Sequence, residues 1–204
     1  MNEVITKIQD PFPYLKIENL YTEEELELIG DELIFLNHKS KLEGPEDTGS
    51  AKDSSDNLLK ENRGLFLDDL YKRREISNIL SVNRKLFNKE YLEAYASLSF
   101  GYKSILECNY DATLISYYEN GGYYKPHKDS SMHTALTWFF EVPKMFEGGD
   151  LFFPEYNEKI EIQQNITVIF PSFVIHSVEE VKMKENISQG LGRYCMSQFM
   201  TVTL

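Results

Sequence analysis

The sequence has few cysteines and no long apolar run. Cys108 and Cys195 are its only cysteines, too few for a disulfide framework, and no CxxC or Cys/His zinc spacing occurs. No stretch reaches the about 18 consecutive apolar residues of a membrane span, and MNEVITKIQDPFPYL has acidic residues and prolines where a signal peptide needs an apolar run. We therefore expect a cytoplasmic protein that neither crosses nor enters a membrane.

Clusters of basic residues are also scarce. The formal net charge is -12 and the pI is near 4.8. The only dense basic run, Lys72 to Arg74, lies close to Asp68 and Asp69. A negative field repels the phosphate backbone unless a basic stripe overrides it. The charge balance thus predicts that no nucleic acid is a partner, while a small anion in a local pocket is compatible with it.

The amino-terminal half is predicted to be mainly helical. The composition, 42% hydrophobic and 26% charged, is typical of a globular protein, and 204 residues suit a single domain, 1–204. Thr22 and Glu25 form a capping-box pattern ahead of apolar residues at helical spacing, which predicts a helix of about four turns. Residues 39–64 are polar and predict a long loop. Leu70 to Tyr95 predicts one long helix or two broken ones, so residues 1–105 would be helical support.

From about Leu106 the pattern changes to short β-rich runs separated by turn residues. These runs are ATLISYY, YYKPHKD, TALTWFFEV, DLFFPEY, IEIQ, ITVIFP, VIHSVEEV and RYCMSQFMTVT. About eight short strands in such a length indicate an antiparallel sandwich or jelly roll. The predicted fold class is therefore mainly β, a jelly roll over residues 106–204 preceded by a helical amino-terminal region.

Two histidines and an aspartate are candidate metal ligands. In YYENGGYYKPHKDSS, alternation along a strand would place His127 and Asp129 on one face. A His-x-Asp pair alone is weak, because Asp and Glu are 33 of 204 residues, and His176 alone is better explained as a satisfied core histidine. Together they make the two-His-one-carboxylate set that binds non-haem Fe(II) and leaves coordination positions open.

Arg193 is the next candidate. It opens the last predicted strand, GLGRYCMSQFM, and shares a face there with Cys195 and Ser197. An arginine among apolar strand residues needs an anion. That anion is either a structural carboxylate or, beside Fe(II), the carboxylate of a ligand, which the planar guanidinium can hold with two hydrogen bonds.

Four segments together resemble the Fe(II)/2-oxoglutarate-dependent dioxygenases, specifically their prolyl 4-hydroxylase-like branch. They are YYENGGYYKPHKD, FEGGDLFFPEY, VIFPSFVIHSVEEV and GRYCMSQF, in the family's order, and the resemblance covers about residues 106 to 203. It implies a double-stranded β-helix, which is the jelly roll predicted from the strand pattern. It also implies Fe(II), 2-oxoglutarate as cosubstrate and O2, with ascorbate as a candidate reductant.

The resemblance assigns roles to individual residues. His127, Asp129 and His176 match the iron ligands, and Arg193 matches the residue that binds the distal carboxylate of 2-oxoglutarate. The remaining matches are a hydroxyl that assists this arginine and two tyrosines that face the cosubstrate or precede the metal pair: Ser197, Tyr118 and Tyr124. For the two tyrosines, aromatic core packing is an equally good explanation.

Two positions depart from the family pattern. His176 and Arg193 are 17 residues apart, longer than is usual in the branch, which predicts an insertion, VKMKENISQG, near the mouth of the site. Phe199 stands where peptidyl-proline enzymes commonly have Trp. The expected reaction is hydroxylation of an unactivated C–H bond coupled to decarboxylation of 2-oxoglutarate to succinate and CO2. The substrate is a peptidyl proline, or a free amino acid or small metabolite.

Other functions stay open at this point. A nucleic-acid demethylase would share the iron site, but the acidic balance and the lack of a second arginine after Arg193 argue against it. A non-enzymatic, cupin-like jelly roll that binds metal for structure or sensing would have no need of Arg193 beside the three ligands. The loop 39–64 is expected to act as a lid that separates peptide from small-molecule substrates.

Overall fold

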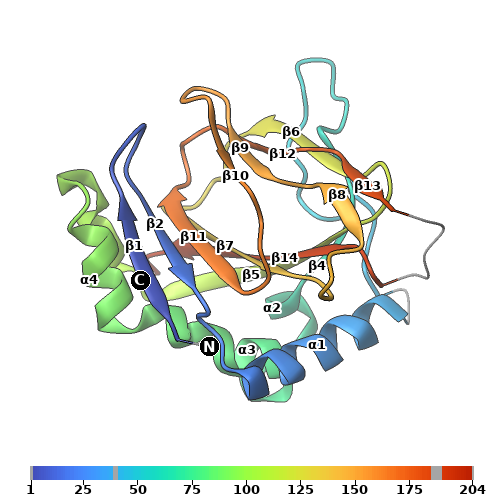
Figure 1. Cartoon of the computed structure of the whole chain (residues 1–204), viewed down its shortest axis with the longest axis horizontal. Helices are drawn as coiled ribbons and strands as arrows, with labels where there is room; N and C mark the ends of the chain where they lie inside the picture. Colours follow the sequence, from blue (N-terminus) through green and yellow to red (C-terminus); the bar gives the residue numbers. More distant parts are fainter. Residues whose placement is uncertain (1, 39–40, 185–189, 204) are drawn as a thin grey trace.

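Two antiparallel sheets face each other in the computed structural model, which describes residues 2–38, 41–184 and 190–203 (Figure 1). The larger sheet has the order β1 (Val4–Ile8), β2 (Tyr14–Glu18), β11 (Ile166–Pro171), β7 (His133–Phe139), β14 (Arg193–Thr201), β5 (Tyr110–Tyr118) and β4 (Arg63–Phe66). The smaller has the order β10 (Glu158–Ile160), β9 (Leu151–Phe153), β12 (His176–Val178), β6 (Tyr123–His127) and β3 (Lys60–Glu61). A separate pair joins β13 (Val181–Met183) and β8 (Phe146–Gly148).

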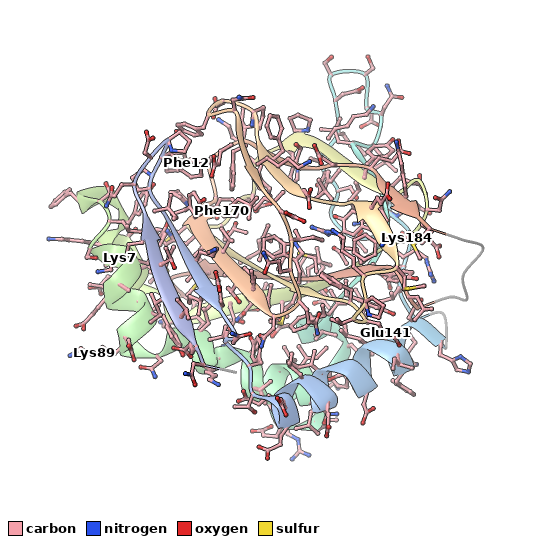
Figure 2. The ribbon with its side chains drawn as sticks, in the orientation of Figure 1. Lys7, Phe12, Lys89, Glu141, Phe170 and Lys184 are labelled. Atoms are coloured by element: carbon pink, nitrogen blue, oxygen red, sulfur yellow. The ribbon has the colours of Figure 1, made fainter. Side chains whose placement is uncertain are left out.

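The larger sheet is buried on both faces, as the alternation along β14 shows. Tyr194, Met196 and Met200 belong to a cluster that includes the helices, whereas Cys195 belongs to the cluster between the two sheets. Phe170 of β11 is fully buried in this second cluster, while Lys7 and Lys89 lie at the periphery (Figure 2). The predicted mainly β jelly roll with supporting helices is confirmed.

The helices gather beside the larger sheet, on the side away from the smaller one (Figure 1). The α-helices are α1 (Glu23–His38), α2 (Leu67–Leu70), α3 (Asn78–Val82) and α4 (Lys89–Ala96), and the 3₁₀ helices are η1 (Arg74–Ile76), η2 (Asn83–Phe87) and η3 (Phe100–Glu107). The predicted four-turn helix is α1, and its capping box forms: the Glu25 amide donates to Thr22 Oγ1 at 3.2 Å and the Thr22 amide to Glu25 Oε2 at 2.8 Å.

Three details of the predicted amino-terminal half are wrong. The region from Leu70 to Tyr95 is a series of short helices, because Ser77 and Asn88 cap new helices at α3 and α4. The half that was predicted to be mainly helical also supplies β1 to β4 to the two sheets. The segment 39–64, predicted as one polar loop, contains β3, the start of β4 and a bridge between Glu43 and Gly64.

Smaller differences occur in the second half. Phe146 to Gly148, expected to lie in a turn, forms β8, and the single strand expected at VIHSVEEV is divided into β12 and β13. Of the predicted insertion VKMKENISQG, residues 185–189 lie outside the described residues. Among the helices that the structure describes, none is both long enough and apolar enough to span a membrane.

Candidate active site

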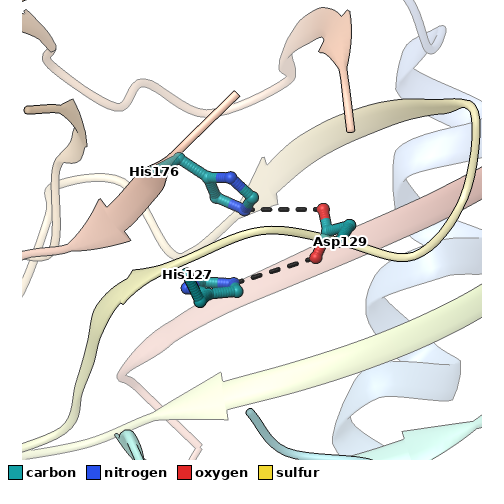
Figure 3. Close-up of side chains that lie close together, drawn as sticks. All are labelled: His127, Asp129 and His176. Carbon is teal, nitrogen blue, oxygen red and sulfur yellow. Dashed lines mark ion pairs between the residues drawn. The ribbon is translucent and has the colours of Figure 1, made fainter. Parts of the chain in front are cut away.

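His127, Asp129 and His176 converge between the two sheets (Figure 3). β12 pairs with β6 so that His176 lies directly opposite His127, and Asp129 follows β6, with its amide donating to the Ser172 carbonyl at 3.0 Å. His127 Nε2 lies 3.8 Å from Asp129 Oδ1, and His176 Nε2 lies 3.5 Å from Asp129 Oδ2. These separations are too long for direct hydrogen bonds. The three ligand atoms lie within 4.8 Å of one another, around a common point that a metal ion could occupy.

Backbone carbonyls orient both imidazoles. His127 Nδ1 is 2.9 Å from the Lys125 carbonyl and His176 Nδ1 is 3.0 Å from the Val174 carbonyl. With Nδ1–H donated to a carbonyl, each Nε2 presents its lone pair to the common point, the arrangement found in metal-bound histidines. Burial, followed by the neighbouring His176, lowers the pKa of His127 to about 3, so this ring is neutral and able to coordinate a metal at neutral pH.

A chain of hydroxyl groups fixes the carboxylate. Thr134 Oγ1 donates to Asp129 Oδ2 at 2.6 Å. Ser172 Oγ lies 2.8 Å from Thr134 Oγ1 and 2.7 Å from Ser131 Oγ. Such outer contacts set the orientation of a metal ligand. Nothing in the sequence marks Thr134 as functional beyond its place five residues after Asp129.

Arg193 is fully buried, and none of its three side-chain nitrogens has a hydrogen-bond partner among the described residues. Its guanidinium lies 4.6 Å from the centre of the Tyr118 ring, which is opposite it in the register of β14 and β5. The Cys195 thiol is close enough to Arg193 and Asp129 for both charges to affect its pKa, which burial raises. A buried guanidinium without a counter-ion fits the distal carboxylate of 2-oxoglutarate.

Gly149 makes room for this arginine. Its φ of +73° belongs to the left-handed region, and a Cβ built there would lie 2.8 Å from Arg193 Cδ and 3.0 Å from Val181 Cγ2. Any side chain at position 149 would therefore displace Arg193 or the neighbouring strand. In the sequence, the feature that marks Gly149 is its place in the FEGGD segment.

The other predicted residues lie around the same space. Ser197 is buried on β14, two residues after Cys195 and four residues after Arg193. Tyr118 is 3% exposed, and burial raises its pKa. Tyr124 stacks on His127, with ring centres 3.4 Å apart, and its hydroxyl accepts a hydrogen bond from the Ala51 amide at 3.0 Å. Tyr118 thus contacts the arginine, and Tyr124 links a metal-ligand candidate to the segment 41–59.

Sequence reasoning missed two further buried polar groups near Arg193. The Asn62 side chain is within hydrogen-bonding reach of the hydroxyl of Tyr118, the residue opposite Arg193 in the register of β5 and β14. The indole nitrogen of Trp138 has no hydrogen-bond partner among the described residues, and Trp138 is opposite Cys195 in the register of β7 and β14. Unpaired buried donors are uncommon in folded proteins.

A cavity of about 380 Å³ adjoins Asp129, one of the three candidate ligands. Asp129 and Tyr124 form one side of it, and the segment from Thr48 to Ala51 forms another. The lining residues from the sheets and their connections include a lysine, two phenylalanines and smaller apolar residues: Lys60, Phe66, Ala112, Leu114 and Phe199. The segment expected to act as a lid is thus a wall of this cavity, and Phe199 faces it.

The fold and the site together define a non-haem iron oxygenase: a jelly roll with a two-His-one-carboxylate set and a buried arginine between its sheets. Residues 113–201 match the family model of the 2OG-Fe(II) oxygenase superfamily. The match lies within the part of the chain in which the sequence resembles that superfamily. The prediction of an enzyme that depends on Fe(II), 2-oxoglutarate and O2 is confirmed at this level. A search of curated proteins finds no match.

Solved structures with a similar fold include prolyl hydroxylases, in agreement with the predicted branch. A Pseudomonas putida prolyl-4-hydroxylase is 14% identical with a TM-score of 0.64, and the match covers 94% of this chain and 93% of that one. A collagen prolyl hydroxylase of Paramecium Bursaria Chlorella virus-1, in a 2OG complex, is 17% identical with a TM-score of 0.55, covering 93% and 96%. A Trichoplax adhaerens prolyl hydroxylase with a hypoxia inducible factor peptide is 12% identical with a TM-score of 0.61, covering 92% and 83%.

Proposed function

We propose that the protein hydroxylates an unactivated C–H bond and couples this to decarboxylation of 2-oxoglutarate to succinate and CO2. The observation that carries the proposal is the buried, unpaired Arg193 in the same inter-sheet space as the three candidate ligands. A protein that binds metal only for structure or sensing has no use for such a guanidinium, whose burial without an anion is costly. The cupin-like alternative is therefore the weaker one.

Each residue has a definite task in this proposal. His127, Asp129 and His176 would hold Fe(II), and Arg193 would hold the distal carboxylate of 2-oxoglutarate, with Ser197 and Tyr118 beside it. The bound iron, 2-oxoglutarate and O2 supply the oxidising chemistry, and the protein supplies orientation and a dry site. Phe153 and Phe170, both fully buried, have ring centres 6.4 and 4.9 Å from that of His176 and exclude water there.

The substrate is a peptidyl proline, or a free amino acid or small metabolite. Two fold neighbours are a collagen prolyl hydroxylase and an enzyme solved with a peptide fragment, which favours a peptide. Another neighbour, NgTET1, was solved with 5mC DNA at a TM-score of 0.51, so the exclusion of nucleic acid rests on the charge of this chain alone. The cavity beside Asp129 has the volume of a small-molecule site, which favours a small substrate.

The direct test is succinate formation from 2-oxoglutarate in air with Fe(II), over a panel of proline peptides and free amino acids. We expect turnover by the wild type, loss with Asp129→Ala, and loss with Arg193→Met that high 2-oxoglutarate restores in part. Arg84→Met is the matched control, because Arg84 pairs with Asp111 outside the site. Metal binding with neither turnover nor binding of 2-oxoglutarate would show the cupin-like alternative to be correct.

A further inference from the structure

The cavity beside Asp129 contains a second buried cation. Lys60 is 3% exposed, and no carboxylate among the described residues lies within ion-pair distance of its ammonium group. Its contacts are a long hydrogen bond of 3.3 Å to the Thr48 carbonyl and the Tyr124 ring, whose centre is 5.5 Å from Nζ. Lysine is rarely buried without a partner, because the ammonium loses its hydration.

The strand pairing holds Lys60 close to the candidate iron ligands. β3 pairs with β6 so that Lys60 lies opposite Tyr124, and Tyr124 stacks on His127. Lys60 is also near enough to His127 for its charge to affect the imidazole. Lys60 therefore lines the cavity beside Asp129, next to the tyrosine ring that stacks on His127.

2-Oxoglutarate does not account for this cation. Of its two carboxylates, one would bind the metal and the other Arg193, which leaves no anionic group for Lys60. Among the described residues, Lys60 and Arg193 are the buried lysine and arginine. Each has hydrogen-bond donors without an anionic partner, so the site can bind a further anion in addition to 2-oxoglutarate.

The other residues that line the cavity indicate the chemical character of the rest of that ligand. Phe66, Leu114 and Phe199 form an apolar wall, while Thr48 and Ser50 bring hydroxyl groups near the lysine side. The volume of about 380 Å³ is that of a small-molecule site. An internal prolyl residue of a peptide has no carboxylate to offer Lys60.

We propose that Lys60 binds the carboxylate of the primary substrate, and that this substrate is a small carboxylic acid with an apolar body, such as a free apolar amino acid. The inference rests on the proposed hydroxylase function and chooses between its two substrate classes. The apolar body would lie against Phe66 and Phe199, with the C–H bond to be hydroxylated turned toward Asp129. Burial lowers the pKa of Lys60 to about 8, and a bound carboxylate would hold the proton on it.

The test compares apolar L-amino acids with their carboxamides, which have the same body and no charge. With wild-type protein, we expect the acids, and not the amides, to stimulate succinate formation and to bind the Mn(II)-loaded protein in calorimetry. Lys60→Met should raise the KM for the acid at least tenfold and abolish the preference for acid over amide, and Lys60→Arg should retain the preference. Lys52→Met, in the same segment and paired with Asp56, is the charge-matched control.

The outcomes separate this inference from the proposed function. Equal stimulation by acid and amide, stimulation by blocked prolyl peptides alone, or an unchanged KM in Lys60→Met would overturn the role of Lys60 while the hydroxylase function stands. Lack of 2-oxoglutarate turnover under every condition would contradict the hydroxylase function instead. Calorimetry of acid and amide with the wild type and Lys60→Met needs no turnover, so it decides the role of Lys60 in that case also.

Discussion

At the scale of single residues, the site depends on groups whose usual partners are absent. Arg193 has no oxygen acceptor among the described residues, and the Nε2 atoms of His127 and His176 face Asp129 without bonding to it. The other polar atoms of the candidate ligands do have hydrogen-bond partners. Two backbone carbonyls bond the Nδ1 atoms of the imidazoles, and Thr134 bonds the carboxylate of Asp129. The protein thus orders the binding groups before any ligand arrives, which lowers the entropic cost of binding.

Thr134→Val tests the hydroxyl that holds Asp129. The variant keeps the shape of the side chain and removes the 2.6 Å hydrogen bond to Oδ2. We expect Fe(II) affinity to fall by about 10- to 100-fold, the usual effect of losing an outer contact to a metal ligand. Thr137→Val is the matched control on the same strand, because Thr137 bonds only Thr167 at 2.8 Å. Equal loss of affinity in both variants, measured by metal titration, would show that Thr134 has no special role.

Gly149→Ala tests the space around Arg193. The new Cβ would lie 2.8 Å from Arg193 Cδ, so we expect 2-oxoglutarate affinity to fall at least tenfold while Fe(II) affinity stays within about twofold. Gly121→Ala is the control, since Gly121 also has a positive φ, +83°, and no atom lies within 4 Å of its built Cβ. If both variants lose 2-oxoglutarate affinity equally in calorimetry, backbone strain rather than the clash with Arg193 is responsible.

At the scale of elements, the helices are fastened to the larger sheet by polar as well as apolar contacts. His133 at the start of β7 lies 3.1 Å from the Tyr95 hydroxyl of α4 through Nδ1, and 2.8 Å from Ser104 Oγ of η3 through Nε2. Tyr95 and Tyr102 stack beside it with ring centres 4.8 Å apart. His133, which is not one of the candidate metal ligands, is thus a structural connection between the sheet and the helices.

This connection makes stability depend on pH. Burial lowers the pKa of His133 to about 4, so the folded protein favours the neutral ring. Below the ordinary value of about 6.5 the unfolded chain takes up a proton that the folded protein does not, so the free energy of unfolding falls between pH 6.5 and 4. We expect urea denaturation to show a shallower fall in His133→Gln than in the wild type. Identical pH profiles would mean that His133 titrates normally in the folded protein.

At the scale of the whole molecule, the rhythm of short β-rich runs and turn residues predicted the jelly roll, because each run is one strand of an antiparallel sheet. His127 and Asp129 could be predicted from local spacing, and His176 because iron sites need a second histidine. Lys60 could not be predicted. Its burial comes from the pairing of β3 with β6, and the polar residues around it favour a solvated loop. The short helices were missed because caps at Ser77 and Asn88 interrupt one continuous apolar pattern.

The net charge of -12 yields a prediction at the same scale. Duplex DNA should bind with a Kd no tighter than about 10⁻⁴ M at physiological salt, because the protein has no basic stripe to release counter-ions. Fluorescence anisotropy with methylated and unmethylated duplexes measures this directly. Saturable binding in the micromolar range, with a steep dependence on salt, would show that a basic surface has been overlooked.

The central claim is that one site between the sheets holds both the metal and 2-oxoglutarate. It is tested most directly by a crystal structure of the protein with Mn(II) and 2-oxoglutarate, using the anomalous signal of the metal. The account predicts a single anomalous peak bounded by His127 Nε2, His176 Nε2 and a carboxylate oxygen of Asp129, with the distal carboxylate of 2-oxoglutarate hydrogen-bonded to Arg193. A metal peak elsewhere, or 2-oxoglutarate bound without contact to Arg193, would contradict it.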